Sequence, residues 1–156
     1  MVEMVGVLAI MGLVTAAAFI LIQSGLGSQK MSRAADEIDI LASNVRSMIA
    51  HADGVAKTLP ATTDVDTKGK QLAASILKSD ASTPLGGYYA VTRFNNTAKD
   101  YTIHLRGISE DDCETMAARA YPNMESFADG SPNPSCITSG TGDDDISYNV
   151  KIVFKY

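Results

Sequence analysis

The residues of this chain with the clearest chemistry are its two cysteines, Cys113 and Cys136. An even number of cysteines in a chain exported past a membrane favours a disulfide. The alternatives are two free thiols or a metal site. The spacing fits no CxxC zinc or redox motif, and neither His51 nor His104 lies at a zinc-finger offset. We therefore expect a disulfide, which would tie the 123–142 stretch to a short helix before it and add roughly 3 kcal/mol.

Three consecutive acids, Asp143 to Asp145, are a candidate calcium site, because oxygen-rich loops bind calcium. Their side chains project in different directions, and no glutamate follows at EF-hand spacing, so a solvated acidic turn is the favoured interpretation. Serine, histidine and aspartate are present without a nucleophile elbow or a triad signature, and no phosphate-binding glycine loop occurs. We predict that the chain is not an enzyme and uses no metal or cofactor.

The third candidate is Glu3, which stands before an uncharged apolar run from Met4 to Ile22. About 20 apolar residues cross a bilayer, so this run predicts a transmembrane helix. A carboxylate in the first turn of a helix is favoured by ~0.3–1 kcal/mol, which is one explanation of Glu3. The other is a functional charge, since ionisable groups in hydrophobic spans usually have a specific partner.

The elements that position these residues begin with a long helix, expected from about Val2 to about Asp53. Its apolar part contains small residues that allow close approach of another helix, although membrane helices also simply tolerate glycine. Two further glycines, Gly25 and Gly27, each weaken a helix by ~1 kcal/mol and predict a kink or an unwound stretch around 23–28. The small residues of the apolar part are Gly6, Ala9, Gly12 and Ala16 to Ala18.

Beyond residue 30 the helix becomes amphipathic, and its apolar stripe must cover a core. The stripe consists of Met31, Ala34, Ile38, Leu41, Val45, Met48 and Ala52. Gly54 is placed to end this helix. A continuous helix of this kind is about 75 Å long, at ~1.5 Å per residue, which is more than a domain of this size needs. Half of the helix must therefore find its partners outside its own domain.

The remainder of the chain predicts a connector followed by a small sheet. Alternation and β-branched or aromatic residues indicate strands, and Ser109 with Asp112 resembles a capping box at the start of a helix. The expected elements are a helix around 71–78, strands at 88–94 and 101–106, a helix from 109 to about 120, and a strand at 146–154. With 156 residues and a net charge of −5, the chain allows one modest domain plus an appendage and lacks the basic patch of a nucleic-acid-binding protein.

The opening segment MVEMVGVLAIMGLVTAA (1–17) resembles the mature N-terminus of type IV pilins, and VLAIMGLV (7–14) is most similar to the type IVb branch of toxin-coregulated and longus-type pili. The segment GISEDDC (107–113) is also similar to the approach to the first cysteine of that branch. The family glutamate, which Glu3 matches, normally lies two residues further from the terminus. Either two residues are missing ahead of Met1, or this pilin is shortened.

The resemblance implies an α+β fold, with a long N-terminal helical spine packed against a C-terminal antiparallel sheet. It implies a transmembrane and filament-core helix at 1–28 and a globular domain at 29–156. That domain divides into a helix half at 29–53, a connector at 54–87, and the sheet with its disulfide-bounded region at 88–156. Glu3 would pair with the terminal amine of a neighbouring subunit, which is the amine of Met1 if this pilin is shortened and that of an earlier residue if two residues are missing. Gly12 matches a glycine near which the helix unwinds inside the filament.

The function implied is the major subunit of a type IVb pilus, a homopolymer for adhesion, aggregation or conjugative contact. The implied partners are identical subunits, the inner membrane before assembly, a prepilin peptidase with N-methylation, the assembly machinery, and a host or neighbouring cell surface. The expected location is an extracellular filament, with no nucleic acid bound. Two alternatives stay open: a minor pilin or type II secretion pseudopilin, and a single-pass membrane-anchored binding module.

Overall fold

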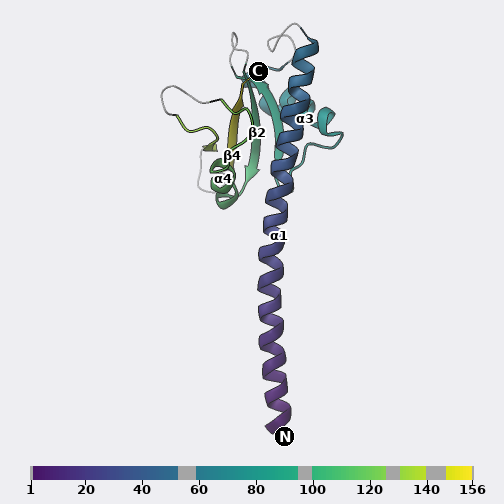
Figure 1. Ribbon diagram of the computed structural model, residues 1–156, viewed down its shortest axis with the longest axis vertical. Coiled ribbons are helices and arrows are strands. Elements are labelled where there is room, and N and C mark those ends of the chain that lie inside the picture. Colours follow the sequence, from purple (N-terminus) through teal and green to yellow (C-terminus); the bar gives the residue numbers. More distant parts are fainter. Residues whose placement is uncertain (1, 53–58, 95–99, 126–130, 140–146, 156) are drawn as a thin grey trace.

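In the computed structural model the chain forms one long helix and a small domain beside the C-terminal half of that helix (Figure 1). The described residues are 2–52, 59–94, 100–125, 131–139 and 147–155. The architecture is α+β, with an N-terminal helix and a four-stranded antiparallel sheet, as the sequence predicts. The predicted end of the helix at Gly54 and the acids at 143–145 lie outside the described residues.

Helix α1 runs from Val2 to His51, 50 residues, and its second half carries the predicted apolar stripe. Ala34, Ile38, Leu41 and Val45 are each fully buried in the domain core. The other three predicted members are not: Met31 and Met48 are half-buried, and Ala52, beyond the end of the helix, is exposed. The buried face is wider than the stripe, because other helices of the domain as well as the sheet pack against this half of α1. These additional buried residues are Ala35, Ala42 and Ile49.

The predicted interruption of α1 around 23–28 is wrong for the single chain, because the α-helix continues unbroken through Gly25 and Gly27. A glycine in a helix interior costs about 1 kcal/mol but keeps its N–H donor, so it does not end a helix as proline does. The projecting half is therefore a straight extension of the half that packs on the domain (Figure 1).

The connector after α1 contains a 3₁₀ turn η1 (Thr62–Asp64), a π turn η2 (Val65–Gly69) and helix α3 (Lys70–Leu77). The predicted helix around 71–78 is confirmed, and the two preceding turns were not predicted. Gly69 lies so close to the first strand that an added Cβ would stand 3.1 Å from the Val91 carbonyl oxygen. This glycine lets the connector pack directly on the sheet.

The sheet has the order β1-β2-β4-β3, and all neighbouring strands are antiparallel. Its strands are β1 (Tyr88–Arg93), β2 (Tyr101–Ile108), β3 (Ser135–Ser139) and β4 (Ser147–Phe154). Three strands confirm the predicted pattern, while β3 was not predicted. Alternate residues, such as Ile103, Leu105 and Ile152, are buried in the core that the sheet shares with α1.

Helix α4 (Glu110–Ala117) begins as the sequence predicts, with the Ser109 hydroxyl accepting a hydrogen bond from the Asp112 amide at 3.3 Å. It ends three residues before the predicted boundary at about Ala120. Cys113 and Met116 are its buried residues and attach α4 to the edge of the core.

Candidate assembly surface

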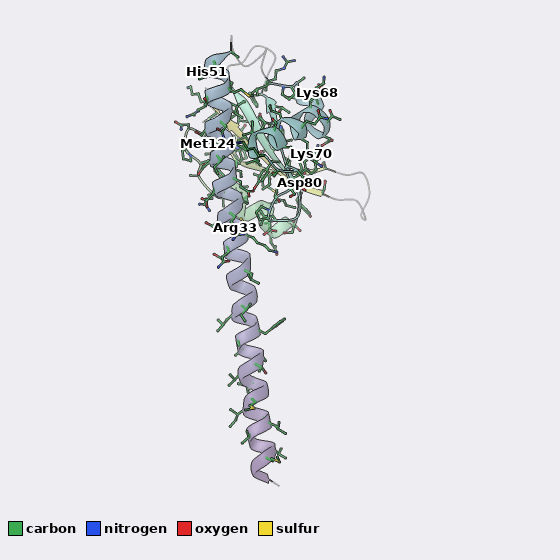
Figure 2. All side chains as sticks on the ribbon, turned by 90° about the vertical axis from the view of Figure 1, so that its right-hand side faces the viewer. Arg33, His51, Lys68, Lys70, Asp80 and Met124 are labelled. Atoms are coloured by element: carbon green, nitrogen blue, oxygen red, sulfur yellow. A yellow bond between two sulfur atoms is a disulfide. The ribbon has the colours of Figure 1, made fainter. Side chains whose placement is uncertain are left out.

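The first half of α1 projects from the domain and contacts no other described element (Figures 1 and 2). Figure 2 shows Arg33 at the lower edge of the domain, with side chains pointing outward around the helix below it. Twelve large apolar side chains on this half are exposed, from 52% for Leu26 to 77% for Met4. They are Met4, Val5, Val7, Leu8, Ile10, Met11, Leu13, Val14, Phe19, Leu21, Ile22 and Leu26.

This apolar surface is continuous and surrounds the helix, whereas exposed apolar patches of soluble monomers seldom exceed a few hundred Å². Fully burying one such side chain makes the free energy more favourable by about 1.5–3 kcal/mol. Outside the projecting half, Ile40 and Ile137 are the only exposed large apolar residues in the part of the chain that the structure describes. Almost all exposed large apolar side chains of the described residues therefore lie on one element, the projecting half of α1, which the domain does not cover.

The glycines of the projecting half have open space around them. A Cβ added at Gly6, Gly12, Gly25 or Gly27 would meet no atom within 4 Å. Within one chain these glycines therefore serve no close contact, and their predicted role in packing against another helix stays a prediction. The unwinding predicted near Gly12 concerns the filament, so the unbroken helix of the single chain leaves it a prediction too.

The residues predicted to form the inter-subunit ion pair are only partly placed. Met1 lies outside the described residues. The backbone of Glu3 belongs to the first turn of α1, and its side chain lies outside the described set. The structure thus places Glu3 at the free end of the helix, far from the domain (Figure 1).

The predicted transmembrane helix at 1–28 is not confirmed. Within the described part of the chain, no helix is long and apolar enough to cross a membrane.

The domain holds α1 through two buried tyrosines as well as through apolar packing. The Tyr89 hydroxyl donates to the Ala34 carbonyl at 3.2 Å, and the Tyr101 hydroxyl donates to the Ala42 carbonyl at 3.0 Å. Burial raises the pKa of both phenols, for Tyr101 to about 12, so both stay neutral donors. This role was not predicted from the sequence, because β1 begins with two tyrosines and its alternation does not show which of them faces inward.

These two hydrogen bonds reach α1 at positions eight residues apart, and their donors lie on different strands. A helix fixed at two such points cannot easily rotate or slide against the sheet. The direction of the projecting half is therefore determined by the domain. Arg46 adds a third connection, donating to the Lys155 carbonyl at 2.8 Å.

The predicted disulfide is confirmed. Cys113 of α4 is bonded to Cys136 of β3, with their Cα atoms 5.7 Å apart and a sequence separation of 23. The bond joins α4 to the edge strand β3, which has only β4 as a neighbour in the sheet. It thereby fixes the edge strand that lies farthest along the sheet from β1.

The two histidines are in unrelated places. His51 is in the last turn of α1, where its Nδ1 lies 2.6 Å from the Ser47 carbonyl oxygen. His104 is on β2, with its Nε2 3.0 Å from the Thr92 hydroxyl. Burial, followed by the positive charges of Lys151 and Arg106, lowers the pKa of His104 to about 4. It is therefore a neutral side chain at neutral pH.

The far side of the sheet carries a polar cluster around Asp66 of η2. Asp66 accepts hydrogen bonds from the Tyr88 hydroxyl at 2.5 Å and from the Arg106 guanidinium. The Tyr88 bond, then Arg106, lower the pKa of the Asp66 carboxyl despite slight burial. This cluster attaches the connector to the sheet. Among the described residues no group of histidine, cysteine and acidic side chains is arranged to hold a metal ion.

No family model matches the chain, and neither a curated protein nor a solved structure is similar to it.

Proposed function

We propose that this chain is the subunit of a helical cell-surface filament of the type IV pilus kind, most similar to the type IVb branch and acting as its major subunit. One observation carries the proposal: half of a 50-residue helix projects from the domain with twelve large apolar side chains uncovered. Copies of the chain would bury these surfaces against one another at the filament centre. The domains would then lie outside and form the filament surface.

Three features of the domain support this arrangement. The buried tyrosines hold α1 in a fixed direction, so that all copies present the apolar half alike. The domain covers only one side of the second half of α1, so the rest of the helix can face neighbouring copies. The disulfide stabilises the outer edge of the sheet, which suits a protein exposed outside the cell.

Glu3 would determine the alignment of neighbouring subunits by pairing with a terminal amine. An ion pair at ~4 Å and an effective dielectric near 20 is attractive by ~4 kcal/mol before desolvation is subtracted. Because desolvation removes most of this gain, the pair would select one register more than it would add net stability. An unpaired carboxylate in a dry helix bundle is strongly unfavourable, so wrong registers are disfavoured.

The other steps implied by the resemblance stay predictions. They are an inner-membrane stage before assembly, processing by a prepilin peptidase, action of an assembly machinery, and contact of the finished filament with a host or neighbouring cell.

The test is electron microscopy of the fraction sheared from cells that express the chain, with mass spectrometry of the filament protein. We expect filaments made mainly of this chain. The variant Glu3→Ala should be present in cells at the normal level yet yield few or no filaments. The matched control Glu114→Ala, at an exposed position of α4, should assemble normally. Normal filaments from Glu3→Ala would refute the role of Glu3, and absence of filaments from the unaltered chain would refute the proposed function.

A further inference from the structure

A hollow of about 440 Å³ lies on the face of the sheet opposite α1. Phe94, which continues β1, and Val153 of β4 form an apolar part of its lining, together with Pro132. The polar part of the lining comes from Ser131, Ser135 and Lys151 of β4. Small-molecule sites typically combine a mainly apolar lining with a few polar groups in this way.

Lys151 gives the hollow its charge. Its Nζ lies 5.1 Å from the centre of the Phe94 ring, a cation–π contact that keeps the ammonium group at the hollow. On the neighbouring strands it stands opposite His104 and Ser135, and neither carries a negative charge at neutral pH. Among the described residues, no carboxylate lies within ion-pair distance of Lys151.

The wall of the hollow is preformed. The Asn133 amide nitrogen donates to the carbonyls of Glu125 at 2.7 Å and Val153 at 2.8 Å, and its oxygen accepts from the Val153 amide at 3.0 Å. These three bonds use both ends of the Asn133 amide and fasten the segment before β3 to the end of β4. Asn133 is thus a positioning residue, and the hollow needs no rearrangement to form.

We propose that this hollow binds a saccharide that carries a carboxylate, such as a uronic or sialic acid. Lys151 would pair with the carboxylate, the Ser135 hydroxyl would bond to a sugar hydroxyl, and the C–H face of the ring would lie on the apolar lining. A neutral sugar would leave the ammonium without a negatively charged partner. An anion without a ring would leave the apolar lining uncovered.

The proposal does not depend on the filament, but the filament would amplify it. The hollow faces away from α1, so a polymer with α1 at its centre would display one copy per subunit on its surface. Repeated weak sites on one particle can raise overall avidity by roughly 10²–10⁴ over a single site. Single-chain affinity in the millimolar range would then suffice for attachment to a surface rich in acidic sugars.

The test is titration of the full chain, in a detergent without a sugar headgroup, followed by amide NMR shifts. The probes are D-glucuronate and D-glucose, which differ at one carbon, with acetate and the dipeptide Glu-Glu as further arms. We expect saturating shifts in 131–135 and 151–153, with glucuronate bound about tenfold more tightly than glucose, as a charged hydrogen bond allows. The variant Lys151→Met should remove this difference, while the matched Lys155→Met, outside the hollow, should preserve it.

Each arm decides one part of the proposal. Equal affinity for glucose and glucuronate, or an unchanged preference in Lys151→Met, would overturn the role of the carboxylate. Acetate or Glu-Glu binding as tightly as glucuronate would overturn the saccharide. Shifts confined to other surfaces would overturn the site. Because the titration uses unassembled chain, its failure leaves the filament proposal intact, and absence of filaments leaves this one intact.

Discussion

Two leucines on the same helix provide a matched test of the division between core and assembly surface. Leu41 is fully buried in the domain, whereas Leu13 is 74% exposed on the projecting half. We expect Leu41→Ala to lower the free energy of unfolding of the domain by about 2–5 kcal/mol, as for other buried leucines. Leu13→Ala should change that quantity by less than about 0.5 kcal/mol, since Leu13 lies on the projecting half and is not part of the domain core.

For filament assembly we expect a large effect of Leu13→Ala, in contrast to its small effect on domain stability. Leu→Ala removes about three methylene equivalents, and at about 0.8 kcal/mol each the transfer contribution is about 2.4 kcal/mol. Because Leu13 is 74% exposed in the single chain, about three quarters of this, or about 1.8 kcal/mol, depends on assembly. The subunit concentration needed for assembly should therefore rise about twentyfold.

Domain stability is measured by thermal unfolding in detergent, followed by the near-ultraviolet circular dichroism of the buried tyrosines. Assembly is measured as the ratio of sheared filament to total subunit in cells with graded expression. Leu8→Ala, at a second exposed position, tests whether the effect is shared by the projecting half or is specific to Leu13. If Leu13→Ala and Leu8→Ala both assemble like the unaltered chain, the projecting half is not the assembly surface. If they destabilise the domain as Leu41→Ala does, the assignment of the two halves of α1 is wrong.

Three further predictions concern the domain. Replacing Cys113 and Cys136 by serine should lower the free energy of unfolding by about 3 kcal/mol, measured by urea titration; an unchanged midpoint would contradict the disulfide's stabilising role. The pKa of His104 is about 4 in the folded state against 6.5 for the ordinary group, so the unfolded chain binds more protons between these values. Stability should therefore fall by about 3 kcal/mol as the pH drops from 6.5 to 4, and His104→Gln should lose this part of the pH dependence. Gly87→Ala would place a Cβ 1.9 Å from the Arg106 carbonyl oxygen, so thermal unfolding should show a large loss of stability, whereas a neutral result would contradict the packing of the segment before β1.

The elements that sequence reasoning predicted correctly are those with a strong local period. The stripe that includes Ile38, Leu41 and Val45 follows the helical repeat, and the alternation of β2 and β4 follows the strand repeat, so local pattern and tertiary burial agree. The cysteine pair was predictable for a different reason, because two cysteines allow only one intrachain bond.

The features that were missed depend on contacts between distant segments. Strand β3 has five residues, is preceded by Pro132 and Pro134, and owes its pairing to β4 and the disulfide. The hollow beside Lys151 is built from three separate segments, and no period or motif links them. One predicted feature is not present. Gly25 and Gly27 indicated a break in α1, but the helix continues through them, because the free-energy cost of each glycine is smaller than the gain from continuing the backbone hydrogen bonds.

The most direct test of the central claim is a helical reconstruction of filaments made by this chain, at a resolution that shows side chains. It should place residues 4–26 at the filament centre, in contact with the same residues of neighbouring copies and without solvent between them, and the sheet face bearing Lys151 on the outside. A filament with the apolar half of α1 at its surface, or a chain that stays monomeric after release from the cell, would contradict the account.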